Sequence, residues 1–296
     1  MLTPKRDHAH GIAVSFELFP PKSAEALPAL DRTVDALAAL SPEYFSVTYG
    51  AGGTTRDRTR GVVDRVMKRT GLPVAHHLTC VEASRAEIDG LARDLRASGI
   101  RKIVALRGDP QGGSAYTPPD DGYAYAADLV EGLMRAGDFD ISVAAYPEVH
   151  PQAKSAEDDL DNLRRKLDAG ARVAITQYAF DTDAVLRFID RARAAGIDAP
   201  IVPGIMPVSN FAGLKRFSEK CGAIIPGWLE EMFDGLDERP ETRAMVAAAV
   251  ATEQCRRLAE AGVTEFHFYT LNRAGLSTAI CRALGVSETL PAKSAA

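Results

Sequence analysis

Cysteine is scarce in this sequence of 296 residues, and the four that occur lie far apart. Cys80, Cys221, Cys255 and Cys281 form no C-x-x-C pair, so the sequence supports neither a disulfide framework nor a cysteine zinc site. Reduced, scattered thiols are typical of a cytoplasmic protein, and a cytoplasmic localisation is what we expect.

Long apolar runs and an excess of basic residues are also missing. The Ala-rich run Met245–Ala251 is far shorter than the roughly 18 apolar residues of a membrane span, and the N-terminus lacks the apolar segment of a secretory signal. The 35 Lys and Arg residues are outnumbered by 40 Asp and Glu residues, giving a formal net charge of −5. Nucleic-acid binding requires a basic face, so we expect neither a membrane nor a nucleic acid as a partner.

Motifs for several common kinds of site are absent as well. The glycine-rich segment 50–55 lacks the third glycine of G-x-G-x-x-G, and the chain has no Walker A lysine. The six histidines show no metal-ligand spacing, and the adjacent His76 and His77 point to opposite faces of a strand. No lysine stands at a strand end, where a Schiff-base enzyme needs one. We therefore expect no metal and no Rossmann dinucleotide site.

The sequence does contain a regular alternation of short β-branched or aromatic runs with longer amphipathic runs. This alternation predicts βαβ units and a parallel sheet. The predicted strands are Ile12–Phe19, Tyr44–Tyr49, Val74–Cys80, Lys102–Leu106, Ile141–Tyr146, Val173–Tyr178, Ile201–Ile205 and Glu265–Tyr269. The predicted helices are Ser23–Ala39, Arg56–Thr70, Arg85–Ala97, Ala124–Arg135, Ala156–Ala169, Thr182–Ala195, Phe211–Lys220 and Pro240–Ala261.

Eight strands with right-handed crossovers favour a closed (β/α)8 barrel, the TIM barrel of the α/β class, over an open sheet. The segment Gly222–Ile225 is short and has no helix-length spacer before it, so we interpret it as a loop rather than a ninth strand. No linker rich in Gly, Ser or Pro divides the chain. We expect residues 1–296 to form one barrel domain with flexible ends at 1–11 and 288–296.

Polar side chains gather at the carboxyl ends of the predicted strands, where barrel enzymes bind their substrates. Glu17 stands out because it lies between Phe16 and Leu18 inside a strand. Burial of such a carboxyl group raises its pKa, which suits a proton donor near neutral pH. A carboxylate paired with a barrel Arg or Lys is an equally good interpretation of these residues.

Two further segments carry charged residues that have two explanations each. Asp109 comes two residues after Arg107, and this spacing fits either a site carboxylate or a loop ion pair. On the helix after the fifth strand, Asp159, Asn162 and Lys166 share one face. That face suits a phosphate or ribityl group, although a solvated polar stripe has the same pattern.

Eight motifs, taken in order, resemble one enzyme family. They are Ser15–Pro21, Ser46–Thr59, His77–Cys80, Leu106–Asp109, Ala144–Lys154, Ile175–Gln177, Pro203–Phe211 and His267–Arg273. Together they make the chain similar to methylenetetrahydrofolate reductase in its bacterial single-domain form. The resemblance implies an FAD-containing barrel that reduces 5,10-methylenetetrahydrofolate to 5-methyltetrahydrofolate in one-carbon metabolism and methionine biosynthesis. It further implies NAD(P)H as electron donor, a ping-pong hydride relay that can also run in reverse, and a homo-oligomer.

The resemblance also implies roles around the folate substrate. Glu17 corresponds to the general acid that protonates the folate as its five-membered ring opens, which agrees with the pKa argument above. Asp109 corresponds to a carboxylate that stabilises the cationic iminium and tunes the flavin. The remaining substrate-binding positions are Gln177, Phe217 and Arg273. One departure is Gly213, where some relatives have a glutamine that touches the substrate, and this difference is expected to loosen substrate binding.

Sixteen positions correspond to FAD-binding residues of the family. Arg107 and Lys166 are the expected partners of the pyrophosphate, because both side chains are cationic. The full set is Thr48, Tyr49, Ala51, His77, Arg107, Gly108, Asp109, Tyr125, Ala126, Tyr146, His150, Ala153, Asp159, Asn162, Arg165 and Lys166.

Two alternative functions stay open at this point. One is a folate reductase without flavin, in which hydride passes directly from the nicotinamide. The other is a barrel that binds folate or flavin without catalysis. Ping-pong kinetics distinguish the flavin relay from direct transfer, because a relay releases the first product before folate binds.

Overall fold

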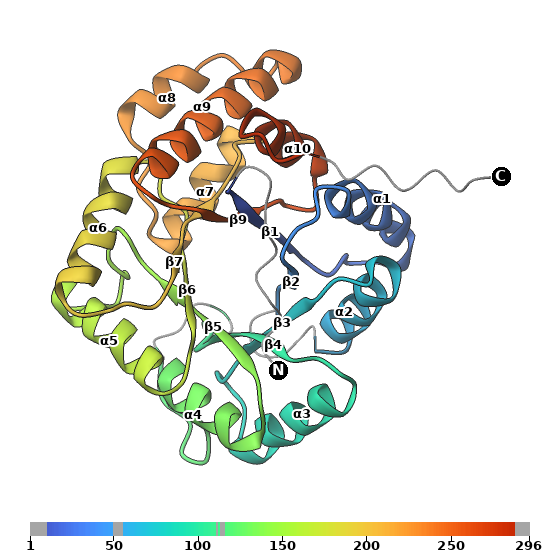
Figure 1. The fold of residues 1–296 in the computed structure, drawn as a ribbon, viewed down its shortest axis with the longest axis vertical. Helices are drawn as coiled ribbons and strands as arrows, with labels where there is room; N and C mark the ends of the chain where they lie inside the picture. The colour runs from blue at the N-terminus through green and yellow to red at the C-terminus, as the bar shows by residue number, and fades with distance from the viewer. Residues whose placement is uncertain (1–10, 50–55, 111, 113–115, 288–296) are drawn as a thin grey trace.

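The strands of the protein close into a barrel with helices around it (Figure 1). The computed structural model describes residues 11–49, 56–110, 112 and 116–287. The predicted flexible ends, 1–11 and 288–296, therefore lie outside the described residues except for Gly11. The described strands form one nine-stranded sheet, and every pair of neighbouring strands is parallel. The predicted TIM barrel is confirmed.

Each predicted strand is present, with small shifts at its ends. The bounds are β1 Ala13–Leu18, β2 Phe45–Val47, β3 Val74–Thr79, β4 Lys102–Leu106, β5 Asp140–Ala145, β6 Val173–Thr176, β7 Ile201–Val202, β8 Gly204–Ile205 and β9 Glu265–Tyr269. Around the barrel the order is β7-β6-β5-β4-β3-β2-β1-β9-β8.

The seventh predicted strand, Ile201–Ile205, is divided in two. β7 pairs with β6, and β8 pairs with β9, so the barrel closes at this division. Pro203 lies between the two pieces and has no N–H to donate, which interrupts the ladder. Its carbonyl oxygen accepts a hydrogen bond from the N–H of His267 at 3.0 Å. The prediction of one continuous strand is therefore wrong, because the chain changes its pairing partner at the proline.

Helices cover the outer surface of the barrel (Figure 1). After a short 3-10 helix at Ala24–Ala26, their bounds are α1 Leu27–Ala38, α2 Arg56–Thr70, α3 Arg85–Ala97, α4 Ala126–Ala136, α5 Ala156–Asp168, α6 Thr182–Ala194, α7 Phe211–Cys221, α8 Gly227–Phe233, α9 Pro240–Glu260 and α10 Ala274–Ala283. α8 and α10 are absent from the predicted set. Gly222–Ile225 contains no strand, as predicted, and lies between α7 and α8. Across the described residues, no helix combines the length and apolar character that crossing a membrane requires.

The main hydrophobic core lies between the strands and the helices. On β1, Val14, Phe16 and Leu18 point outward and are buried. The Phe16 ring centroid lies 6.1 Å from that of Phe45 on β2 and 5.8 Å from that of Phe268 on β9. Because side chains alternate along a strand, the residues between these point into the barrel.

His267 of β9 is one of the buried residues inside the barrel. Its Nδ1 lies 2.7 Å from Oγ of Ser15 on β1, and its Nε2 lies 3.4 Å from Oγ of Ser46 on β2. Burial lowers the pKa of His267 to about 3, so the ring is neutral at pH 7. One neutral side chain thus connects three strands below the rim of the barrel.

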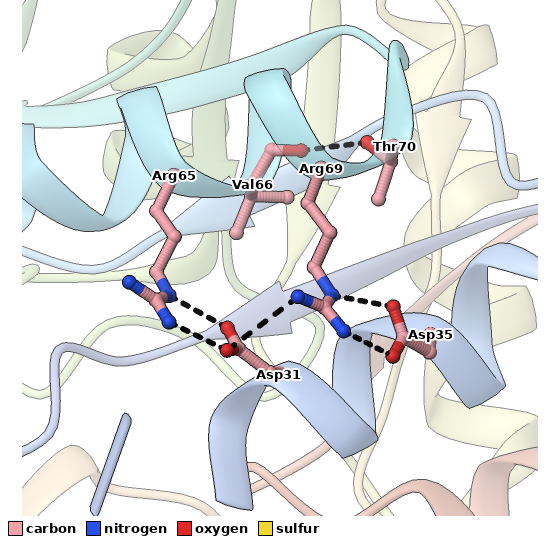
Figure 2. Close-up of polar contacts among 6 residues, drawn as sticks. All are labelled: Asp31, Asp35, Arg65, Val66, Arg69 and Thr70. Atoms are coloured by element: carbon pink, nitrogen blue, oxygen red, sulfur yellow. Dashed lines mark hydrogen bonds and ion pairs between the residues drawn. The ribbon is translucent and has the colours of Figure 1, made fainter. Parts of the chain in front are cut away.

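A network of ion pairs joins α1 to α2 on the outer surface (Figure 2). Arg65 donates to both carboxylate oxygens of Asp31 at 2.6 and 2.5 Å, and Arg69 donates to both of Asp35 at 2.5 Å. Hydrogen bonds from these arginines hold the pKa values of both aspartates below their usual range. The arginine side chains remain about two-fifths exposed, so water screens the pairs and their contribution to stability is modest.

Candidate active site

The carboxyl ends of β4 and β5 and the helices that follow them enclose a cavity of about 840 Å³. This volume is in the range of pockets that hold cofactors or drug-sized ligands. Twelve of the positions that correspond to FAD-binding residues line it, which are Arg107, Gly108, Asp109, Tyr125, Ala126, Tyr146, His150, Ala153, Asp159, Asn162, Arg165 and Lys166.

Three other FAD positions, Thr48, Tyr49 and His77, do not line this cavity. Thr48 and Tyr49 directly follow β2, and the Thr48 N–H donates to the carbonyl of the last residue of β1 at 2.9 Å. His77 lies inside the barrel, with its Nε2 3.6 Å from Oε2 of Glu17. Ala51 lies outside the described residues.

Gly108 shapes the turn after β4. Its φ of +83° lies in the left-handed region, which L side chains rarely adopt. A Cβ at this position would lie 2.7 Å from Cγ1 of Val81 and 2.8 Å from Cβ of Thr79. Glycine is therefore required for the backbone to pass this close to β3.

Arg107 is fixed at the edge of the cavity by several partners. Its Nη1 donates to Oε1 of Gln152 at 2.6 Å, and its guanidinium lies 4.5 Å from the centroid of the Tyr116 ring. Its Nη2 donates to Oδ1 of Asp109 at 3.2 Å. The Asp109 side chain is 85% exposed, so the loop ion pair is present while the carboxylate stays open to a ligand. Gln152 and Tyr116 also line the cavity and are absent from the predicted set.

The loop after β5 forms a second side of the cavity. The rings of Tyr146 and His150 meet edge to face at 4.6 Å, and the His150 N–H donates to Oδ2 of Asp159 at 2.9 Å. Nδ1 of His150 accepts from the Gln152 N–H at 3.0 Å, and burial lowers the pKa of this histidine. Val149 has a φ of +69°, an unfavourable value for a β-branched residue. The packing of this loop therefore holds local strain beside the cavity.

The polar face predicted on α5 lines the cavity as a unit. Asp159, Asn162 and Lys166 all line it, and Arg165 joins them from the same helix. Nζ of Lys166 donates to the carbonyl oxygen of Ala144 on β5 at 2.5 Å. Burial lowers the pKa of Lys166 to about 8, and the carboxylate of Asp159 opposes this shift. A partly desolvated cation of this kind is suited to bind an anionic group.

Tyr125 stands at the start of α4, where its N–H donates to Oδ2 of Asp128 at 2.8 Å. Its side chain is 54% exposed, although its ring centroid lies only 5.7 Å from that of Tyr116. Ala126 is the first residue of the helix. The two tyrosines present aromatic surface to the cavity on which a planar group can stack.

Glu17 lies on the opposite side of the barrel mouth, at the carboxyl end of β1. Its side chain is 21% exposed, and burial raises the pKa of its carboxyl group to about 8. Within the described ranges, no Arg or Lys forms an ion pair with it. Burial, with His267 and His76 nearby, lowers the pKa of the adjacent His77 to about 3. At neutral pH the carboxyl group therefore keeps its proton beside a neutral imidazole.

Tyr269 of β9 completes the surroundings of Glu17, its partner in the register of β1 and β9. Its hydroxyl donates to the carbonyl oxygen of Thr176 at 2.7 Å, and burial raises its pKa well above the usual value. A Cβ at Gly204 would lie 2.4 Å from Cε2 of Tyr269. The tyrosine therefore serves as a fixed, neutral side of the mouth.

The other three predicted folate-binding residues follow β6, lie within α7 and directly precede α10. Gln177 follows β6, and its Oε1 accepts from the Tyr178 N–H at 3.0 Å. Phe217 of α7 is 50% exposed, with its ring stacked 6.1 Å from that of Tyr178. Arg273 is exposed at the start of α10. Gly213, the position of the departure, donates its N–H to Oδ1 of Asn210 at 3.0 Å.

Metal ligands do not cluster in this site. Within the residues that the structure describes, no three His, Cys, Asp or Glu side chains are arranged to hold a metal ion. His76 and His77 do point to opposite faces of β3, since the His76 ring lies 5.8 Å from that of Tyr49 while His77 lies beside Glu17.

The fold of the chain is similar to those of solved folate- and pterin-binding proteins. A protein from Clostridium thermocellum that binds two copies of 5-methyl-5,6,7,8-tetrahydrofolic acid has a TM-score of 0.67 over 93% of this chain and 95% of its own. Dihydropteroate synthase from Xanthomonas albilineans has a TM-score of 0.52 over 93% and 91%. Both are 15% identical in sequence, so the likeness concerns the fold alone.

Sequence comparison identifies the family. Residues 4–285 match the family model described as methylenetetrahydrofolate reductase. The chain is 55% identical to 5,10-methylenetetrahydrofolate reductase from Pectobacterium carotovorum, over 93% of this chain and 91% of that protein. It is 52% identical to the Escherichia coli enzyme of the same name, over 94% and 93%. It is also 36% identical to methylenetetrahydrofolate reductase (NADH) 1 from Zea mays, where it spans 49% of the relative. The chain belongs to the methylenetetrahydrofolate reductase family.

Proposed function

We propose that this protein reduces 5,10-methylenetetrahydrofolate to 5-methyltetrahydrofolate with NAD(P)H as donor and FAD as a bound hydride carrier. The observation that carries the proposal is the placement of Glu17, a carboxyl group that keeps its proton at neutral pH at the barrel mouth. Ring opening of the folate requires a proton on a ring nitrogen, and a group with a pKa near the working pH supplies it well.

The residues of the cavity fit a flavin dinucleotide. The half-buried cation of Lys166 and the guanidinium of Arg107 suit its pyrophosphate, and the exposed ring of Tyr125 offers a stacking surface. The turn at Gly108 lines the same cavity. When bound, FAD supplies hydride transfer, while the protein provides binding, orientation and electrostatics.

Glu17 has the role of general acid in this proposal. The same desolvation that holds its proton at neutral pH makes the ionised carboxylate unfavourable after transfer, so the side chain is driven to take up a proton again. His77 and Tyr269 are neutral neighbours and offer no charge that would trap the ionised form.

Asp109 has a complementary electrostatic role. Its carboxylate is open to the cavity, and Arg107 holds it from one side at 3.2 Å. A negative charge here stabilises the cationic iminium that forms on the folate as its ring opens. The other expected folate contacts are the amide of Gln177, the exposed ring of Phe217 and the guanidinium of Arg273.

The substitution Glu17→Gln tests this assignment, because it removes the acidic carboxyl proton and keeps the size and shape of the side chain. We expect folate reduction by the reduced holoenzyme to fall by about 100- to 10,000-fold, the usual range for loss of a general acid. Reduction of the bound flavin by NADH should stay within about twofold, since that half-reaction needs no proton from Glu17. Stopped-flow flavin absorbance measures both half-reactions separately.

Glu265→Gln is the matched control, because Glu265 lies at the amino end of β9, the opposite end of the strand from the mouth. It should leave both half-reactions unchanged. Equal losses in both half-reactions of Glu17→Gln would contradict the general-acid role. A colourless protein that cannot be reconstituted with FAD would contradict the flavin relay and favour direct hydride transfer.

A further inference from the structure

The loop between β9 and α10 is tied to the end of β1 by several hydrogen bonds. Oγ1 of Thr270 donates to the carbonyl oxygen of Glu17 at 2.6 Å, and it accepts from the N–H of Asn272 at 3.2 Å. The Asn272 amide then bonds Phe19 twice, since Oδ1 accepts from its N–H at 3.0 Å and Nδ2 donates to its carbonyl at 2.8 Å. The loop therefore forms hydrogen bonds with the backbone on both sides of Leu18, the last residue of β1.

The Asn272 amide takes the place of a further rung of the sheet. The β1–β9 ladder ends at Glu17 and Tyr269, and Phe19 is followed by two prolines, which have no N–H. A primary amide has the same donor and acceptor as a peptide group, so it can pair with both polar groups of one residue. The pairing of the two strands is extended in this way past the residue that carries the proposed acid.

The loop keeps an unfavourable backbone conformation in order to make these bonds. Leu271 and Asn272 have φ values of +49° and +55°, two consecutive non-glycine residues in the left-handed region. The Asn272 carbonyl accepts from Oγ1 of Thr33 on α1 at 3.0 Å, and the Arg273 N–H donates to the carbonyl of Thr270 at 2.9 Å. Arg273 is the next residue, so its position is fixed by the same strained turn.

We propose that Asn272 is a positioning residue that sets the placement of Glu17 relative to Arg273, and so aligns the proton donor with the guanidinium that is expected to contact the folate. This inference rests on the proposed function for the roles of Glu17 and Arg273. Thr270 supports the same arrangement from the Glu17 side. Neither residue reaches the reacting atoms, and both act through the backbone that they hold.

If Asn272 only stabilised the fold, its loss would lower stability and weaken both half-reactions alike. Leu271 and Phe19 are 43% and 40% exposed, so the loop covers little of the core. Loss of the amide removes hydrogen bonds without opening a core cavity, and the protein should stay folded. The effect should therefore fall on the folate half-reaction rather than on the whole enzyme.

The test uses Asn272→Ala and Asn272→Asp in the holoenzyme. The aspartate keeps an acceptor for the Phe19 N–H but places a second oxygen against the Phe19 carbonyl, so it should be no better than alanine. We expect the rate of folate reduction to fall by about 10- to 100-fold in both, as for small misplacements of a reacting group, with a raised KM for folate. Flavin reduction by NADH should stay within about twofold.

Three further variants separate positioning from stability. Thr270→Val loses the hydroxyl and should share the defect, whereas Thr270→Ser keeps it and should restore most of the rate. Thr70→Ala is the structural control, because Thr70 also makes two local hydrogen bonds, at 2.8 and 3.1 Å, but lies at the far end of α2. It should lower Tm slightly and leave both half-reactions unchanged.

A second readout does not depend on activity. If the amide holds Glu17 in its buried position, Asn272→Ala should move the pH-dependent change in Tm that Glu17 produces towards lower pH. An unchanged Tm–pH curve together with equal losses in both half-reactions would overturn the inference. Failure of the wild-type protein to reduce folate through flavin would count against the proposed function instead, and the Tm–pH comparison would still decide the role of Asn272.

Discussion

Two halves of the barrel mouth differ in whether their ionisable side chains are neutral or charged at pH 7. The acid half, formed by Glu17, His77 and Tyr269 on β1, β3 and β9, contains ionisable groups that burial keeps neutral at pH 7. The cavity half, formed by Arg107 and Lys166 with their neighbours at the ends of β4 and β5, encloses about 840 Å³ and carries cations and an open carboxylate. One barrel rim therefore holds a proton on one side and offers charge to a ligand on the other.

The difference follows from how each half is built. In the acid half, the paired strands and the hydrogen bonds of Thr270 and Asn272 bring the backbone close together, and the Glu17 side chain is only 21% exposed. In the cavity half, the loops after β4 and β5 separate and leave room between α4 and α5. Desolvation governs the first group of side chains, and ligand charge should govern the second.

The largest effect that we expect from this contrast is a pH dependence of stability caused by Glu17. Its pKa is raised from 4.5 to about 8 in the folded protein. The stabilisation is complete below about pH 4.5 and is lost as pH rises through 8, because the unfolded chain ionises first. The loss should be on the order of 5 kcal/mol in the free energy of unfolding, measured by urea denaturation at several pH values.

Glu17→Gln should remove this dependence between pH 5 and 8.5, so the comparison with wild type isolates it. The buried His77 and His267 act in the opposite sense, since pKa values of about 3 mean that their stabilisation is lost as pH falls below 6.5. If the free energy of unfolding changed with pH in the same way for wild type and Glu17→Gln above pH 5, Glu17 would be ionised and solvated in the folded protein. The acid half would then not differ from the cavity half.

A smaller effect should come from Gly108→Ala in the cavity half. The added Cβ meets Val81 at 2.7 Å in a left-handed backbone, so the turn has to move. We expect a loss of about 2–3 kcal/mol in stability, and FAD binding weakened by about 100-fold because the cavity changes shape. Urea denaturation and titration of flavin fluorescence measure the two effects.

Gly61→Ala is the matched control for that substitution. Gly61 lies within α2, and a Cβ there meets nothing within 4 Å. Alanine should therefore stabilise the helix by about 0.5–1 kcal/mol and leave flavin binding unchanged. If Gly108→Ala behaved like Gly61→Ala, the close approach of the turn to β3 would not shape the cavity.

Much of the fold could be predicted from the sequence, because strand and helix periodicity is a local property. The predictions fail where strand pairing or tertiary packing, rather than the local sequence, determines the structure. Pro203 divides a strand at the point where the chain changes partners, which no apolar pattern in Ile201–Ile205 reveals. α8 has only seven residues, and the sequence of α10 contains a single charged residue, so neither shows a clear amphipathic period.

The site could be predicted where a residue's own neighbours determine its chemistry. Glu17 lies in an apolar strand, and its raised pKa follows from that setting. Tyr116 and Gln152 escape prediction because they reach the cavity only through loop packing against Arg107. Asn272 escapes for the same reason, since its partner Phe19 is distant in sequence and near only once the barrel has closed. A search for amides beside strand ends in the folded barrel would have found it.

The smallest effect should come from the pH dependence of FAD binding through Lys166. Burial lowers the pKa of this lysine to about 8, so it is charged below that pH and neutral above it. If its ammonium group meets the pyrophosphate, affinity should be constant below pH 8 and fall above it by up to about tenfold in total, the affinity of the uncharged side chain being the limit. Lys166→Met should lower the affinity for FAD about tenfold at pH 7 and remove its pH dependence, as measured by flavin fluorescence.

Lys154→Met is the control, because Lys154 lines the same cavity but is exposed, and water screens its charge. If the affinity of the wild-type protein for FAD stayed constant up to pH 9.5, Lys166 would not contact the pyrophosphate. The cationic character of the cavity half would then depend on Arg107 and Arg165.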